Sequence, residues 1–219
     1  AIVAARIHNQ RALLRRLNRE RRDPLIAEAC ARISRVIRKL TLPLDVAQAM
    51  GVEGEATALF WPAFGRALPP EFKLNTRRRR PAGDPANVAL NVVSGLLARD
   101  IRSMALRAGL HAGFGALHTT SDAEEALVYD LIEESRGPLA EACVSALFNR
   151  KALQPDHFAK TTAGLQLTRE GWKAAIRGYE AWVARPIVSP ASGETMLWRS
   201  LMLEQARAYA AACESVGEY

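Results

Sequence analysis

Residues 84–109 read DPANVALNVVSGLLARDIRSMALRAG, and this stretch decides the fold class. Asp84 followed by Pro85 is typical of a helix start, because aspartate caps free backbone amides and proline fits the first helical turn. Apolar residues then recur at helical spacing over 88–108, and Gly109 is suited to end the helix. The stretch therefore predicts one long, apolar-rich helix.

The same signals recur on both sides of this helix. Asp23-Pro24 repeats the cap, and Thr168 precedes another helical pattern. We expect Gly137-Pro138 to break a helix. Further helices are expected over 6–22, 24–40, 43–62, 121–136, 139–151, 169–183 and 195–213. Only the stretch AGLQLT, residues 163–168, alternates as a strand does. The predicted fold is mostly α: a single helical-bundle-like domain over 1–219, with 1–22 a basic helix or arm and at most a short β-hairpin near 163–168.

Composition excludes several classes of protein. Apolar residues make up 49% and charged residues 24%, which supports a sizeable core and argues against disorder. No apolar run is long enough for a transmembrane helix, and the N-terminus lacks the order of a signal peptide. Three widely spaced cysteines indicate reduced thiols. We expect a cytoplasmic protein without a membrane partner.

The positive charge is unevenly distributed. The net charge is +7, yet residues 1–40 alone carry eleven basic and three acidic side chains. A second basic cluster lies over 66–80, and arginine outnumbers lysine 25 to 5. Arginine suits bidentate phosphate binding, so a polyanion is the expected partner. A solvated basic face remains the alternative. The candidate DNA-binding residues are Arg15, Arg16, Arg66, Arg77, Arg78, Arg79, Arg80 and Asn87.

Acidic residues crowd the segment 122–141. Asp130 and Glu133 are three residues apart on an otherwise apolar helix face, where paired carboxylates repel each other and are costly to desolvate. A hard divalent cation would remove both costs. His118 precedes this helix and could complete a mixed imidazole–carboxylate site suited to Mn²⁺ or Mg²⁺. An exposed acidic helix and a structural histidine remain the alternatives.

Glu53 lies between two glycines in GVEG, residues 51–54. Each glycine costs about 1 kcal/mol relative to alanine inside a helix. Such a cost indicates that something approaches the backbone closely. A phosphodiester near a metal-bound Glu53 and a helix–helix contact explain it equally well.

Four motifs occur in an order that resembles one known family. GVEG is followed by RRRRPAGDPAN, GFGALH and LVYDLIEESR, at 51–54, 77–87, 113–118 and 127–136. NQRALLRR at 9–16, segments within 148–180 and LWRSLMLEQARAYA at 197–210 extend the resemblance over nearly the whole chain. These motifs resemble the helical catalytic domain of the CRISPR-associated spacer-acquisition integrase. The family's N-terminal β-rich domain has no counterpart in this chain.

The resemblance implies a site and an activity. Glu53, His118 and Glu133 match the family's three metal ligands, and Asp130 matches an aspartate counted with the catalytic site. Mg²⁺ or Mn²⁺ is the implied cofactor. The implied enzyme is a metal-dependent DNA endonuclease and integrase that joins the 3′-hydroxyl of captured DNA fragments to the repeat array by transesterification.

The implied partners are DNA, a small second CRISPR adaptation protein (Cas two), and further copies of this chain in a homodimer or larger assembly. A mobile-element transposase with the same domain and a non-catalytic helical DNA-binding scaffold remain as alternatives.

Overall fold

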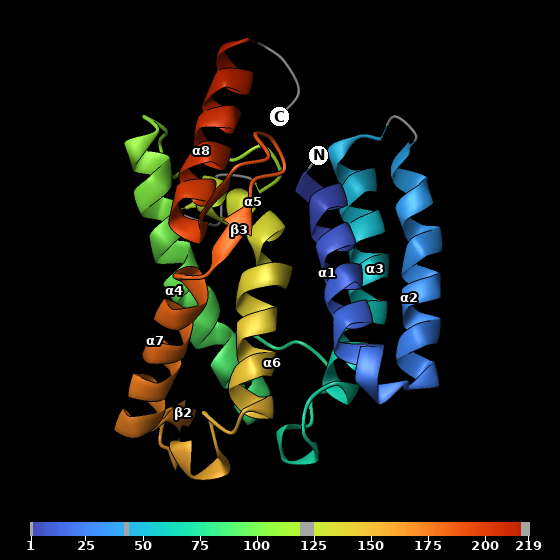
Figure 1. Cartoon of the computed structure of the whole chain (residues 1–219), viewed down its shortest axis with the longest axis vertical. Coiled ribbons are helices and arrows are strands. Elements are labelled where there is room, and N and C mark those ends of the chain that lie inside the picture. The colour runs from blue at the N-terminus through green and yellow to red at the C-terminus, as the bar shows by residue number, and fades with distance from the viewer. Residues whose placement is uncertain (1, 42–43, 119–124, 216–219) are drawn as a thin grey trace.

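The computed structural model describes residues 2–41, 44–118 and 125–215, and Figure 1 shows its helices in two groups. Helices α1, α2 and α3 form one group, and α4, α6, α7 and α8 form the other. Helix α5 lies between them and contacts both α1 and α4. The helices are α1 (Ile2–Arg21), α2 (Pro24–Ile37), α3 (Val46–Arg66), α4 (Pro85–Arg107), α5 (Ala126–Ser135), α6 (Ala142–Asn149), α7 (Arg169–Val183) and α8 (Trp198–Glu214).

Shorter elements connect these helices. The 3₁₀ turns are η1 (Arg38–Thr41), η2 (Pro70–Phe72) and η4 (Pro155–His157), and the π-helical turn is η3 (Arg136–Glu141). Strands β1 (Phe158–Thr161) and β2 (Gly164–Leu167) form one antiparallel hairpin, and β3 (Pro186–Val188) and β4 (Thr195–Leu197) form another. The mostly α fold predicted from sequence is confirmed. The second hairpin was not predicted: its strands are three residues long, and β4 takes the first three residues of the helix expected over 195–213.

Helix starts follow the sequence signals closely. Asp84 accepts a hydrogen bond from the backbone N–H of Asn87 at 2.8 Å, and Gly109 ends α4 with a φ of +81°. Asp23 caps α2, and Thr168 caps α7. These agreements arise because capping is a local interaction.

Several predicted helix boundaries were wrong, and two regions differ most. Helix α3 begins after the missed capping box of Asp45 and Gln48, and it continues through Pro62 to Arg66. Gly137-Pro138 does not break the acidic helix. The chain widens there into the η3 turn, which tolerates the proline's missing N–H, and continues directly into α6. The predicted opening at Pro43 and cap at Ser121-Asp122 lie outside the described residues.

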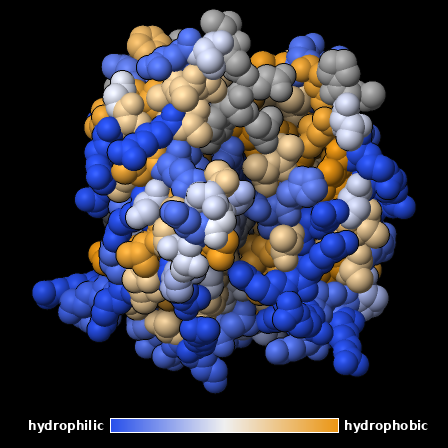
Figure 2. Space-filling view, turned by 45° about the horizontal axis from the view of Figure 1, so that its top comes forward, coloured by the Kyte–Doolittle hydropathy of each residue, from blue (hydrophilic) through white to orange (hydrophobic). Residues whose placement is uncertain are grey.

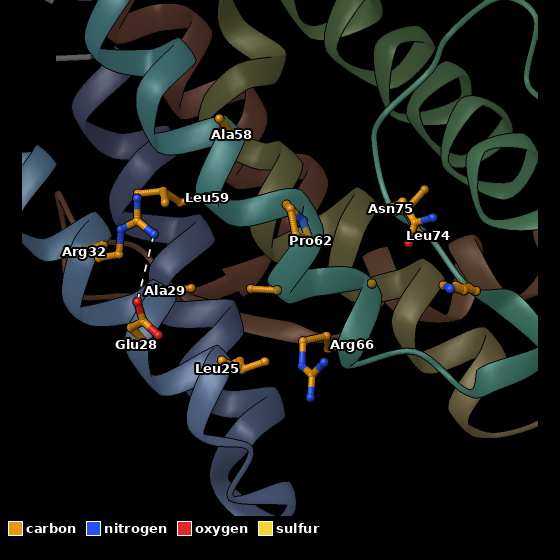
Figure 3. A pocket seen from close by; sticks show the side chains of 13 residues that line it. Leu25, Glu28, Ala29, Arg32, Ala58, Leu59, Pro62, Arg66, Leu74 and Asn75 are labelled. Atoms are coloured by element: carbon orange, nitrogen blue, oxygen red, sulfur yellow. Dashed lines mark ion pairs between the residues drawn. The ribbon is translucent and has the colours of Figure 1, made fainter.

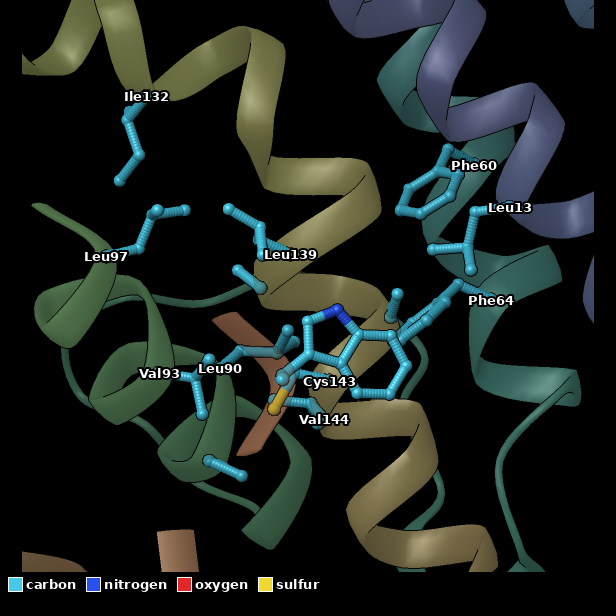
Figure 4. Close-up of a cluster of buried hydrophobic side chains, with 14 of the residues drawn as sticks. Leu13, Phe60, Phe64, Leu90, Val93, Leu97, Ile132, Leu139, Cys143 and Val144 are labelled. Carbon is cyan, nitrogen blue, oxygen red and sulfur yellow. The ribbon is translucent and has the colours of Figure 1, made fainter. Parts of the chain in front are cut away.

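A continuous apolar core joins the two helical groups. Figure 4 shows Leu13 of α1 and Phe60 and Phe64 of α3 on one side of it, with side chains of α4 opposite. Leu139, Cys143 and Val144 fill the space between the groups. Helix α1 also packs on α2, α3 and α5. Segment 1–22 is therefore a packed helix rather than an extended arm over its described residues.

Candidate active site

Two glutamates from distant segments converge on one arginine. Glu53 lies on α3 and Glu133 on α5, and both face α1. The Nη1 atom of Arg6 lies 3.0 Å from Glu53 Oε1 and also contacts Glu133 Oε2. Thr57 donates a hydrogen bond of 2.7 Å to Glu53 Oε1. The fold therefore brings together two carboxylates that are eighty positions apart.

The glycines beside Glu53 face open space. A Cβ atom added at Gly51 or Gly54 would meet no atom within 4 Å. The helix–helix contact considered from sequence is therefore not what these glycines accommodate among the described residues. Gly54 instead lines a cavity of about 610 Å³ that also borders Thr57, Arg6 and Arg77.

Asp130 organises the loop before α5. Its side chain is fully buried. One carboxylate oxygen, Oδ2, accepts hydrogen bonds from the backbone N–H groups of Ala116 at 2.5 Å and Leu117 at 2.9 Å. The other oxygen, Oδ1, accepts one from the N–H of His118 at 3.0 Å. The Asp130 carboxylate thus satisfies the hydrogen-bonding capacity of three backbone N–H groups.

Gly115 permits this close approach. A Cβ atom at this position would lie 2.7 Å from Asp130 Oδ2 and 2.8 Å from the carbonyl carbon of Ala126. Real Cβ atoms are not found that close to backbone atoms, so any larger residue would push the loop away from α5. The glycine in GFGALH is therefore explained by packing of the loop against α5.

His118 is oriented by the same carboxylate. Its Nδ1 lies 2.7 Å from Asp130 Oδ1, and a third of its side chain is exposed. A carboxylate partner at Nδ1 fixes the ring orientation and leaves Nε2 to face a ligand. In this structure both carboxylate oxygens of Asp130 are occupied by hydrogen bonds from residues 116–118. This geometry makes Asp130 a positioning residue for His118.

Glu133 is accompanied by two further buried charged residues, Arg136 and Glu141, whose role was not predicted from the sequence. Arg136 donates to Glu133 Oε1 at 2.8 Å. Glu141 of η3 is buried, and neither of its carboxyl oxygens makes a hydrogen bond of standard geometry. Burial raises the pKa of the Glu141 carboxyl, against the opposing effect of Arg136 and Arg6. In the sequence, Glu141 stood out only as the last member of the acidic segment 122–141.

The predicted ligands form two pairs rather than one cluster. Glu53 and Glu133 meet at Arg6, and His118 meets Asp130. Within the described ranges, no three His, Cys, Asp or Glu side chains lie close enough together to hold a metal ion. The donor set nevertheless fits Mg²⁺ or Mn²⁺, because the two carboxylates already converge on one positive charge. Asp122 and Glu124 lie outside the described residues.

Asn87 is fully buried and is hydrogen-bonded to the arginine run at 77–80. Its side-chain oxygen accepts hydrogen bonds from Arg77 Nη1 at 3.0 Å and from the backbone N–H of Arg78 at 2.8 Å. Its amide nitrogen donates to Asp84 and to the carbonyl oxygen of Thr76. In this structure Asn87 therefore positions the arginines and does not face the solvent.

The arginine run lies next to the carboxylates. Arg77 donates to Asn91 Oδ1 at 2.6 Å, and burial lowers its pKa to about 10. Arg79 lies 6.0 Å from the centre of the Tyr129 ring. Together with Arg136, these two arginines line both the 610 Å³ cavity beside Gly54 and a second cavity of about 300 Å³. Arg78 and Arg80 are exposed.

The remaining candidate basic residues lie elsewhere. Arg66 pairs with Asp23 through Nε at 2.8 Å and Nη2 at 2.7 Å, at the end of the cavity between α2 and α3 shown in Figure 3. Arg15 and Arg16 are exposed near the end of α1, and Arg16 borders a cavity of about 700 Å³ with Arg185. Hydrophilic side chains cover much of the face in Figure 2. No described helix is long and apolar enough to span a bilayer.

Comparison with known proteins gives consistent results. The model of the family "CRISPR associated protein Cas1" matches residues 1–181. CRISPR-associated endonuclease Cas1 3 of Thermus thermophilus is 33% identical over 181 residues, which are 83% of this chain and 54% of that protein.

Two solved structures share the fold. A casposase bound to integration product matches with a TM-score of 0.84 at 21% identity, over 100% of this chain and 60% of the casposase chain. A partial Cas6-RT-Cas1–Cas2 complex matches with a TM-score of 0.84 at 25% identity, over 98% of this chain and 64% of the matched chain.

The chain spans about half the length of the curated relatives it matches. The family model covers most of the chain, and the Thermus relative exceeds 30% identity over more than two thirds of it. The chain therefore belongs to the family of CRISPR-associated Cas1 proteins.

Proposed function

We propose that this chain is the catalytic part of a metal-dependent DNA integrase and endonuclease of CRISPR adaptation. It joins the 3′-hydroxyl of a captured DNA fragment to the repeat array by transesterification. The observation that carries this proposal is the convergence of Glu53 and Glu133 on Arg6, next to a cavity lined by arginines. The His118–Asp130 pair joins the same helix α5 three residues before Glu133. The similarity to a Cas1 endonuclease supports it.

Each part of the site has a distinct task in this proposal. Glu53, Glu133 and the Nε2 atom of His118 hold one Mg²⁺ or Mn²⁺ ion, and Asp130 fixes the His118 ring. When bound, the ion supplies Lewis-acid stabilisation of phosphate charge and activates a hydroxyl or water nucleophile. Arg77 and Arg79 bind neighbouring phosphates and align the scissile bond. One open cavity is lined by Gly54, the neighbour of Glu53, and another by Ile132, the neighbour of Glu133, and these cavities leave room for the substrate.

The test measures strand transfer and DNA binding on the same variants, with Mg²⁺, Mn²⁺ or EDTA. Glu53→Gln, His118→Ala and Glu133→Gln should each lower strand transfer more than about 100-fold, beyond the 10–100-fold typical of residues that only orient ligands. DNA affinity should be retained. Glu55→Gln is the matched control, because this exposed α3 carboxylate pairs only with Lys39 among the described residues.

Retained metal-dependent strand transfer in all three site variants would refute the site. A non-catalytic scaffold would show DNA binding without strand transfer in the unmodified chain. We assign the activity to CRISPR adaptation rather than to a mobile element because the family model and the Thermus relative are both Cas1 proteins.

The proposed assembly is a homodimer or larger complex bridged by Cas2. Joining a fragment at both ends requires two active sites, and one structural relative is described as part of a Cas1–Cas2 complex. Light scattering of the chain with Cas2 and fragment DNA should detect at least two copies per complex. A fully active monomer would refute this arrangement.

A further inference from the structure

Arg6 stands at the point where the proposed metal ligands converge. It lies near the start of α1, the helix that contacts α3, α5 and η3. Its Nη1 atom alone contacts both Glu53 Oε1 and Glu133 Oε2. About 10% of the Arg6 side chain is exposed, so solvent screens these contacts weakly. This single nitrogen neutralises two carboxylates that would otherwise repel each other.

A divalent cation and this guanidinium cannot occupy the same place. Glu53 and Glu133, the carboxylates that Arg6 contacts, are also the ones that would hold the cation, and both the cation and the guanidinium are positively charged. Arg6 and Arg136 already balance Glu53 and Glu133 one for one. Adding a doubly charged ion without moving Arg6 would leave a large uncompensated positive charge in a mostly buried space, which is costly.

The structure offers Arg6 a second acceptor. Glu141 is buried on η3, and its carboxyl oxygens make no hydrogen bond of standard geometry, although the side chain of Gln10 lies near enough to lower its pKa. The Nε atom of Arg6 is also buried without a hydrogen-bond partner. Arg6 is one of the two cations that favour the ionised form of Glu141. Unsatisfied donor and acceptor groups in one buried cluster are rare in stable proteins and indicate an arrangement with a use.

We propose that Arg6 is an internal counter-cation with two positions. It bridges Glu53 and Glu133 in the metal-free protein, and it turns to Glu141 when a divalent cation takes its place. The carboxylates are thereby kept together before the metal arrives. This inference rests on the proposed metal site and adds a residue that competes with the metal.

The first test compares Mn²⁺ binding by calorimetry and thermal midpoints for the unmodified chain and Arg6→Met. Methionine keeps an apolar chain of similar reach without the charge. We expect a lower midpoint without metal, because the two carboxylates then repel, and Mn²⁺ affinity about tenfold higher, equivalent to about 1.4 kcal/mol. Arg19→Met, an exposed change on the same helix, should alter neither quantity. Unchanged or weaker Mn²⁺ binding by Arg6→Met would overturn the inference.

Glu141→Gln keeps the inference testable even where Arg6→Met fails to fold. Removing the second acceptor should weaken Mn²⁺ binding several-fold while Arg6 is present, and should have no further effect in the Arg6→Met background. Unchanged Mn²⁺ affinity in Glu141→Gln alone would overturn the inference. Glu53→Gln and Glu133→Gln separate the two claims. If both bind Mn²⁺ as the unmodified chain does, the metal site itself is wrong and the inference falls with it.

Discussion

Replacing Asp130 by asparagine is the most informative single change in this protein. Its two oxygens accept three backbone hydrogen bonds, from Ala116, Leu117 and His118, and contact the His118 ring. Asparagine has almost the same shape but one acceptor oxygen instead of two. The other position becomes an NH₂ group that faces buried donors. The charge that these donors stabilise is also lost.

The structure sets the size of the effect. Two of the four contacts lose their acceptor, and hydrogen bonds to charged groups contribute about 1.5–3 kcal/mol each, so the upper limit is about 6 kcal/mol. Relaxation of the loop at 113–118 should reduce this loss, because the donors partly belong to a loop at the surface. We expect a loss of about 3 kcal/mol in the free energy of unfolding, which places it among large single-site effects.

Urea unfolding measures the loss in the free energy of unfolding, and amide hydrogen exchange shows whether the loss is centred on the loop at 113–118. Asp130→Asn should lower the urea midpoint and accelerate exchange at Ala116 and Leu117 most strongly. Asp156→Asn, an exposed acid on η4, should change neither. Mn²⁺ affinity should also fall by about 10–100-fold, because the His118 ring loses the partner that orients it. A stability loss below about 1 kcal/mol with unchanged exchange at Ala116 would refute the reasoning.

Three further predictions follow from other contacts. Gly115→Ala should destabilise the protein by about 1–3 kcal/mol through overpacking against α5, measured by urea unfolding. Arg199→Ala should cost about 1 kcal/mol at neutral pH. Hydrogen bonds from Arg199 lower the pKa of Glu180, so this contribution is present above pH 4.5 and is lost as the pH falls further, which acid titration of the thermal midpoint tests. Arg77→Ala should reduce the salt dependence of duplex binding by about 0.9 in slope, and an unchanged slope would exclude a phosphate contact.

Local signals in the sequence predicted local structure well. Asp84 and Gly109 set the ends of α4 because capping depends on a few adjacent residues. The η3 turn could not be foreseen in this way. A Cβ atom at Gly137 would lie 3.1 Å from the carbonyl carbon of Asn9, so this glycine serves the packing of α1 against η3, residues far apart in sequence.

The candidate site was predictable as a set of residue types but not as a geometry. Paired acids on an apolar helix face singled out Glu133, and flanking glycines singled out Glu53. The role of Asp130 depends on how the loop at 116–118, 12 to 14 positions away, folds back onto α5. The presence of Arg6 between the glutamates depends on contacts across 47 and 127 positions. Sequence periodicity carries no information about such contacts. Arg6 in particular resembled any other member of a basic segment.

The placement of Arg6 also changes how the charge of the N-terminal segment should be interpreted. Its eleven basic residues suggest one strong electrostatic surface for DNA. Arg6, however, already forms ion pairs with buried carboxylates, and Lys39 forms one with Glu55. Beyond this segment, Arg66 is likewise bound to Asp23. A basic side chain that already neutralises an acid releases few counterions when it meets a phosphate. The salt dependence of DNA binding should therefore reflect the arginines that are not paired with an acid, and it should be shallower than the formal charge of the segment implies.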